Sequence, residues 1–190
     1  MEIRRHHPLQ RLFTELVERR FLRQLRQDAR VAAYISNVLI DFTHVDNLFR
    51  LRNARGQRLE EVGEMLLASD PLGPHGSFER ERAVRKHIGD YTLFFTGMFP
   101  EAVAATRRRR AFPRLDILLD YVKAGKESYA IVSCFDQFDY RQEAPLFRRL
   151  ADSFELCVYG LNLVKQDLER LQAETCQRLR AQLAPSPPPA

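Results

Sequence analysis

Cysteine is scarce in this sequence of 190 residues, and its three cysteines, Cys134, Cys157 and Cys176, stand far apart. An odd number without the spacing of a metal site does not suit a disulfide framework, so we expect free thiols in a reducing compartment. Long apolar runs are missing too, since none approaches the roughly 18 residues that cross a bilayer. No apolar stretch of the kind that directs secretion follows the basic start of the chain. We therefore expect a cytoplasmic protein with no membrane span.

Lysine is also rare: 26 of the 30 basic residues are arginines, and the net charge is +5. Guanidinium groups suit phosphates, which raises the idea of a nucleic-acid partner. However, the arginines are interleaved with aspartate and glutamate along the whole chain, whereas a nucleic-acid-binding protein concentrates its positive charge. The composition therefore argues against nucleic acid as the partner.

The common catalytic motifs are absent as well. The loop at 73–76 has two glycines but lacks the lysine and the preceding strand of a phosphate-binding loop. Gly-x-Ser-x-Gly, His-Glu-x-x-His, Cys-x-x-Cys and the Glu-x-x-His of di-iron helices do not occur. The sequence therefore predicts no catalytic residues, and it favours a non-enzymatic protein over an enzyme.

What the sequence does contain is the apolar spacing of amphipathic helices. Apolar residues recur at steps of three and four in seven segments: 8–27, 28–49, 57–68, 78–99, 101–110, 113–134 and 144–173. This pattern predicts an all-α fold, a single-domain bundle of six or seven helices with a long C-terminal helix. We place the bundle at residues 1–176 and a proline-rich, disordered C-terminal tail at 177–190.

Two of these segments predict more than a helix. From Phe154 to Leu171 the apolar residues follow a heptad pattern for about two and a half repeats, fewer than a coiled coil requires. This favours a long spine for the bundle, with dimerisation as the alternative. Residues 92–99 are apolar nearly all round, which predicts burial on several sides. Gly89 and Gly97 cost helix stability, so we expect them to permit the close approach of a neighbouring helix.

Histidine and carboxylate side chains suggest a metal site. Asp41 and His44 are three residues apart on one predicted helix, and His87 and Asp90 are three apart on another, so each pair shares a side of its helix. If the helices faced each other, these four side chains and Glu64 could hold zinc, iron or manganese. The helical period, however, turns His44 toward solvent. The alternative is that His87 is a boundary histidine bonded to a carboxylate and that Asp41 and His44 are surface residues.

The sharpest basic feature is the run Arg107, Arg108, Arg109 and Arg110, with Arg114 close behind. Consecutive residues of a helix point in different directions, so at most two of these four can face one phosphate backbone. The cluster could bind an acidic partner, nucleic acid or anionic lipid. The alternative is a solvated helix end, where cations interact favourably with the helix dipole.

A resemblance adds three candidate residues. Residues 85–101 read Arg-Lys-His-Ile-Gly-Asp-Tyr-Thr-Leu-Phe-Phe-Thr-Gly-Met-Phe-Pro-Glu, and a Tyr-x-x-x-Gly-x-x-x-Tyr segment follows at 121–129. Together they resemble the central part of an uncharacterised family of bacterial all-helical cytoplasmic proteins, over roughly residues 80–155. The resemblance implies an all-α bacterial protein and marks Asp90, Tyr121 and Tyr129. It implies no activity.

These patterns leave three hypotheses of function. The leading one is a non-enzymatic helical protein that binds another macromolecule, a partner protein or a second copy of itself, without a cofactor. The second is a metal-binding helical enzyme or sensor that holds a divalent metal through Asp41, His44, Glu64, His87 and Asp90. The third is nucleic-acid binding through the cluster at 107–110.

Overall fold

The computed structural model describes residues 8–53, 55–70, 77–106 and 117–183. Within these ranges the chain is all-α, as predicted, but it forms nine α-helices where six or seven were expected. It also has a π-helix and a 3-10 helix, and its β-structure is limited to one isolated bridge. The elements in order are α1 Pro8–Val17, η1 Glu18–Gln24, α2 Ala29–Asp41, α3 Val45–Leu48, α4 Val62–Ala68, α5 Phe78–Met98, α6 Pro100–Thr106, α7 Ile117–Ser133, η3 Phe138–Gln142, α8 Ala144–Asp152 and α9 Phe154–Leu183.

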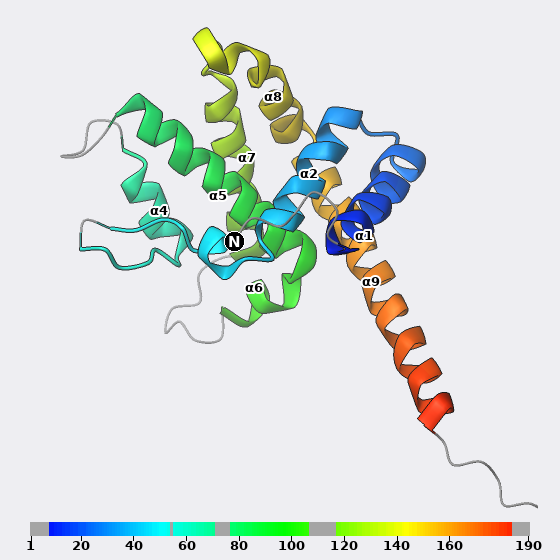
Figure 1. Ribbon diagram of the computed structural model, residues 1–190. Helices are drawn as coiled ribbons and strands as arrows, with labels where there is room; N and C mark the ends of the chain where they lie inside the picture. Colours follow the sequence, from blue (N-terminus) through cyan, green and yellow to red (C-terminus); the bar gives the residue numbers. More distant parts are fainter. Residues whose placement is uncertain (1–7, 54, 71–76, 107–116, 184–190) are drawn as a thin grey trace, which may run out of the picture.

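Helix α5 forms the centre of the fold and packs against α2, α4, α6, α7 and α9 (Figure 1). It begins at Ser77, whose hydroxyl accepts a hydrogen bond from the backbone N–H of Arg80 at 3.1 Å, satisfying one of the free amides of the first turn. All seven residues from 87 to 93 are buried. Leu93 and Met98 belong to one hydrophobic cluster and Val84, Ile88 and Tyr91 to a second, so α5 holds the two clusters together.

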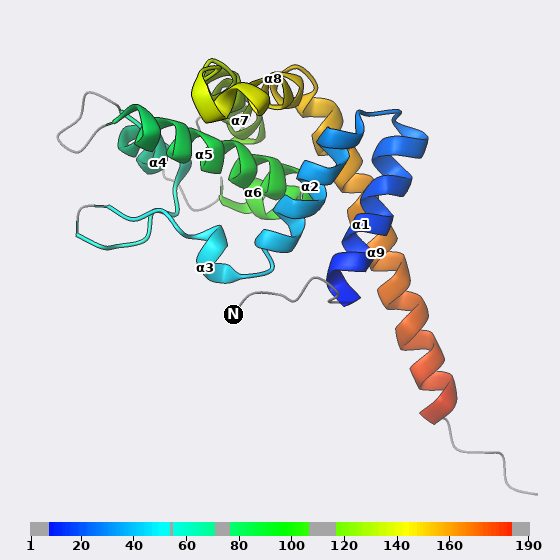
Figure 2. The ribbon, with the colours of Figure 1, turned by 45° about the horizontal axis from the view of Figure 1, so that its top comes forward.

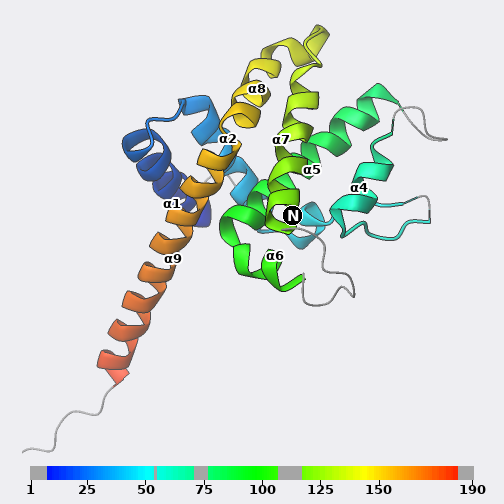
Figure 3. The ribbon, with the colours of Figure 1, turned by 180° about the vertical axis from the view of Figure 1, so that it is seen from behind.

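The larger cluster joins the N-terminal helices to α9, and Figures 2 and 3 show α1 lying alongside α9. The ring of Phe21 is fully buried against Gly160, where an added Cβ would lie 2.5 Å from Cζ of the ring. Next to it, Arg20 forms a two-pronged ion pair with the buried Asp167, with Nε to Oδ2 at 2.7 Å and Nη2 to Oδ1 at 2.5 Å. Paired bonds of this geometry fix the orientation as well as the distance of the two elements.

The predicted helix at 28–49 is wrong at residues 42–44, where the chain breaks into α2 and the short α3. Asp28 caps α2 as expected, by accepting a hydrogen bond from the N–H of Arg30 at 2.8 Å. At the break, the Thr43 hydroxyl donates to the carbonyl of Ile40 at 2.6 Å, and the Asn47 amide donates to the carbonyl of Asp41 at 3.1 Å. Side chains that bind nearby backbone groups compete with helix continuation, which apolar periodicity does not register.

The predicted helix at 144–173 is also two helices, α8 and α9, which meet at Ser153. The Ser153 hydroxyl donates to the carbonyl of Arg149 at 2.7 Å, and the Ser153 N–H donates to the same carbonyl at 2.9 Å. The direction change lets Phe147 and Phe154 both enter the larger cluster. The apolar pattern runs through this junction because both helices bury apolar residues in the same core.

The second half of α9 extends away from the other helices in all three views (Figures 1, 2 and 3). Cys157, Leu161 and Val164 of the heptad pattern are buried, Leu168 is partly buried, and Leu171 is 41% exposed. The helix continues to Leu183, beyond residue 176 where we placed the end of the bundle. Among the described residues, no helix has both the length and the apolar composition needed to cross a bilayer.

Candidate functional site

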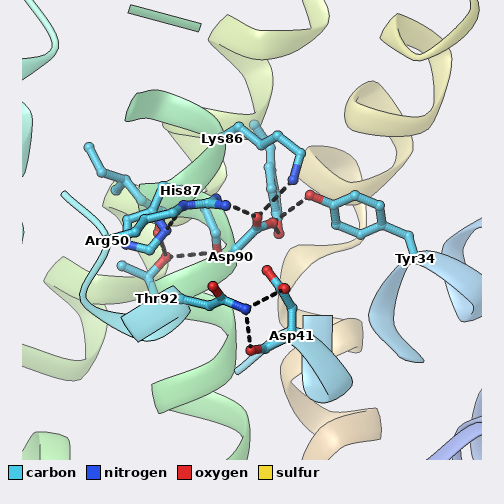
Figure 4. A network of polar contacts seen from close by, with 11 residues as sticks. Tyr34, Asp41, Arg50, Lys86, His87, Asp90 and Thr92 are labelled. Atoms are coloured by element: carbon cyan, nitrogen blue, oxygen red, sulfur yellow. Dashed lines mark hydrogen bonds and ion pairs between the residues drawn. The ribbon is translucent and has the colours of Figure 1, made fainter. Parts of the chain in front are cut away.

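A buried carboxylate, that of Asp90 on α5, is the meeting point of four segments. Its Oδ1 atom accepts hydrogen bonds from the hydroxyls of Tyr34 on α2 at 2.5 Å and Tyr129 on α7 at 2.8 Å. Its Oδ2 atom lies 3.0 Å from Nζ of Lys86, one turn earlier on α5, and 3.8 Å from Nη2 of Arg50, which follows α3. Figure 4 shows the side chains from three of these segments pointing toward Asp90. We call these five residues the Asp90 network.

Glycines allow α5 and α7 to come close enough for this network to form. A Cβ added at Gly89 would overlap the ring of Tyr129, and one added at Gly125 would overlap the hydroxyl of Thr92 and the ring of Phe154. The Gly-Asp pair of α5 and the Tyr-x-x-x-Gly-x-x-x-Tyr segment of α7 are thus two sides of one helix contact. The expectation that Gly89 and Gly97 permit a close approach is confirmed, since a Cβ on Gly97 would lie 2.5 Å from Cβ of Leu161.

The electrostatics of the network keep both tyrosines protonated. Burial raises the pKa of Tyr34 and of Tyr129 well above the ordinary value, and the negative charge of Asp90 raises both further. Each hydroxyl therefore remains a hydrogen-bond donor. The cations opposite Oδ2 lie nearer to solvent, with side chains 31% exposed for Lys86 and 40% exposed for Arg50, so water shares in their solvation.

His87 adjoins the network and is completely buried. Its Nδ1 atom accepts a hydrogen bond from Nε of Arg50 at 3.0 Å, and its ring packs edge-on against Phe42. Burial lowers the pKa of the imidazole to about 4, and the charge of Arg50 acts in the same direction against the opposing effect of Asp90. The ring is therefore neutral at neutral pH. The alternative of a boundary histidine bonded to a carboxylate is wrong, because the ring is fully enclosed and its partner is an arginine.

We predict that His87 makes the fold less stable in mild acid. The unfolded chain takes up a proton near the ordinary histidine pKa of about 6.5, whereas the folded chain does so near 4. Between these values the unfolded state binds more protons, so the free energy of unfolding decreases as the pH falls, by at most about 1.4 kcal/mol per pH unit and about 3 kcal/mol in total. Urea denaturation of the wild type and of His87→Gln across this range measures the effect. Equal slopes in the two proteins would contradict it.

The structure does not assemble the five proposed metal ligands. Among the described residues, no group of three or more histidine, cysteine, aspartate or glutamate side chains could hold a metal ion. Asp41 is exposed, its carboxylate accepts from the amide of Asn47 at 2.8 Å, and no dashed line joins it to Asp90 in Figure 4. His44 is half-buried at the start of α3, and Glu64 is exposed on α4. The prediction that Asp41 and His44 share one side of a helix is wrong, because α2 ends at Asp41 and His44 lies beyond it.

The remaining candidates divide into two groups. Arg107, Arg108, Arg109, Arg110 and Arg114 lie outside the described residues. Tyr121 and Tyr129, which the resemblance marked, both lie on α7. Tyr121 packs against the second cluster, while Tyr129 is fully buried and binds Asp90. The resemblance therefore marked two residues of the Asp90 network, Asp90 and Tyr129.

Sequence reasoning missed three members of the network: Tyr34, Lys86 and Arg50. The spacing of Lys86 and Asp90, four residues apart on one helix, is a signal that could have been recognised. Tyr34 packs against the larger cluster beside the apolar stripe of α2, and no local pattern pairs it with a residue 56 positions away. Arg50 comes from an irregular segment. Only the packing of α2 and α7 on α5 brings these groups together.

Among the described residues, the fold and the network together define an all-α protein in which a buried charge joins several helices. No family model, curated protein or solved structure matches the chain. The chemistry of the site is therefore read from its geometry alone. With two tyrosine donors on Oδ1 and two cations opposite Oδ2, the carboxylate serves to fix α2, α5, α7 and the segment around Arg50 relative to one another.

Proposed function

We propose that this is a non-enzymatic protein that binds another protein through the projecting half of α9, defined as residues 169–183. The observation that carries the proposal is that all ten residues from 169 to 178 are exposed. Most of the stability of a helix in a protein comes from packing one face against its surroundings, and a short helix alone in water is marginal. Binding to a partner would supply that packing.

The apolar pattern of α9 supports the same proposal. The apolar face of α9 is buried at Cys157, Leu161 and Val164. It continues to Leu168, which is partly buried, and to Leu171, which is exposed. A partner helix laid against this end would extend the packing already present. A cytoplasmic location belongs to the proposal and is supported by the cysteines, all three of which are free thiols, with Cys157 buried.

A photo-crosslinking residue in place of Glu174 is expected to capture a specific protein in the cells that naturally produce the chain. The same substitution at Glu79, an exposed residue at the start of α5, is the matched control. Thr175→Pro should abolish the crosslink, because proline interrupts a helix interior. It should leave the thermal unfolding of the bundle unchanged, since residues 169–178 are exposed. Identical crosslinks from both positions, or crosslinks that survive Thr175→Pro, would overturn the proposal.

A further inference from the structure

Between α3 and α4 the described residues 50–53 and 55–59 form a short hairpin, which extends away from the helices (Figure 2). The N–H of Leu59 donates to the carbonyl of Leu51 at 2.9 Å, and both side chains belong to the second hydrophobic cluster. Arg52 and Arg58 form the isolated bridge. Residues directly opposite each other in an antiparallel pair share a face, so both arginines lie on the face turned away from the leucines. We call this segment the arginine hairpin.

The tip of the arginine hairpin is held by its own hydrogen bonds. Oδ1 of Asn53 accepts from the N–H of Arg55 at 2.9 Å and from the N–H of Gln57 at 3.0 Å. Gly56 has a φ of 76°, which glycine adopts without strain. The guanidinium of Arg52 donates to the carbonyl of Gly56 at 3.1 Å and so lies over the turn. Hydrogen bonds therefore hold the Arg52 side chain and the Arg55 backbone at the turn.

The charge of the arginine hairpin is unbalanced. Arg50, Arg52, Arg55 and Arg58 fall within nine residues, and residues 47–59 contain no aspartate or glutamate. Arg50 faces Asp90, and Arg58 binds Asp46 at 2.8 Å. Within the described part of the chain, neither Arg52 nor Arg55 has a carboxylate partner. Asp46 already compensates Arg58, so the charges left for a bound anion to neutralise are those of Arg52 and Arg55.

We propose that the arginine hairpin docks onto an acidic segment of a partner protein, whose carboxylates bind among Arg52, Arg55 and Arg58. This inference rests on the proposed function, because it names the chemistry of a protein partner. Guanidinium groups bind carboxylates with paired hydrogen bonds, and the ordered tip reduces the entropy lost on binding. The anchoring of Arg50 to His87 and Asp90 connects the hairpin to the centre of the fold.

Carboxylates around the hairpin favour a short acidic segment over nucleic acid. Asp46 precedes the hairpin, and the exposed Glu60, Glu61 and Glu64 follow it directly. A nucleic acid carries a charge at every nucleotide over the length of its binding site, and it would run past these carboxylates. A segment with a few carboxylates needs to contact the tip alone. The positive charge open to a ligand is therefore that of the arginines at the tip.

Binding of a fluorescein-labelled oligoglutamate peptide, measured by anisotropy on the full chain, tests this inference. Arg52→Gln/Arg55→Gln/Arg58→Gln should weaken binding about tenfold, the effect expected of three exposed charge pairs. The matched control changes net charge equally at three exposed arginines elsewhere: Arg11→Gln/Arg80→Gln/Arg141→Gln. The control should bind the peptide within about twofold of wild type. Circular dichroism verifies that both variants are folded.

Three results would overturn the inference: no binding of the peptide by the wild type, equal weakening in the control, or tighter hairpin-dependent binding of a labelled oligothymidine. The hairpin and the projecting half of α9 lie at opposite ends of the molecule (Figures 1 and 3). Thr175→Pro should therefore leave peptide binding unchanged. Crosslinks at Glu174 without peptide binding would remove the hairpin inference alone, and peptide binding without those crosslinks would remove the proposed role of α9 alone.

Discussion

Replacing Asp90 with alanine is expected to lower the free energy of unfolding by about 3–4 kcal/mol, because it leaves two buried hydroxyls without an acceptor. Tyr34 and Tyr129 both donate to Oδ1, and the ring of Tyr129 is completely buried. Lys86 and Arg50 are partly exposed and can be hydrated after the change, so the loss of their partner adds little. Urea denaturation followed by circular dichroism at neutral pH measures the difference.

Two milder variants separate the hydrogen bonds from the charge. Asp90→Asn keeps an oxygen acceptor for both tyrosines and should cost about half as much as alanine. Tyr129→Phe removes one hydrogen bond to a charged group and should cost about 1.5–3 kcal/mol. Asp152→Ala is the control, since Asp152 is exposed and pairs only with Arg148 on its own helix among the described residues, and its effect should stay within about 0.5 kcal/mol. An Asp90→Ala protein as stable as this control would show that the network does not hold the helices together.

Gly125→Ala is expected to lower the free energy of unfolding by about 1–3 kcal/mol, although alanine is the better helix former by about 1 kcal/mol. The new methyl group would overlap the hydroxyl of Thr92 on α5 and the ring of Phe154 on α9. Thr92 has little freedom to move, because its hydroxyl donates to the carbonyl of Ile88 at 2.7 Å. Relief therefore requires α7 to shift away from α5, which would also lengthen the hydrogen bond between Tyr129 and Asp90.

Gly63→Ala is the control for Gly125→Ala, and we expect it to change stability in the opposite direction. Gly63 lies in α4 with no atom within 4 Å of an added Cβ, so the gain in helix propensity remains, and we expect a stabilisation of up to about 1 kcal/mol. Thermal unfolding of the two variants beside the wild type compares them. If Gly125→Ala gained stability as Gly63→Ala is expected to, helix propensity rather than interhelical contact would decide the effect at Gly125.

Much of the fold could be predicted from local patterns. The spacing of apolar residues identified α5 and α7 within a few residues, because a helix that buries one face must repeat at 3.6 residues. Ser77 and Asp28 marked helix starts, since their side chains satisfy free amides. The breaks at Thr43 and Ser153 could not be predicted in this way. They depend on hydroxyls that bind backbone carbonyls, which change the chain direction without changing the apolar spacing.

The candidate site was predicted in part. Asp90 and Tyr129 were singled out by a resemblance, and Gly89 by its cost to a helix, but their mutual contact was not foreseen. The metal hypothesis paired Asp41 with His44 from their spacing on one predicted helix, but α2 ends at Asp41, so the two residues do not share a helix. The arginine hairpin also escaped notice, because its arginines share a face only through the bridge between Arg52 and Arg58.

The sequence by itself determined the all-α class and the apolar faces of the helices, because these follow from contacts within a few residues of chain. The tertiary structure alone decided which polar groups meet. Tyr34, Arg50 and Tyr129 are separated from Asp90 by 56, 40 and 39 positions in the sequence. No local sequence pattern predicts that they bind one carboxylate. Burial of that carboxylate among helices makes each distant partner matter, since an unpaired charge in the interior would be costly.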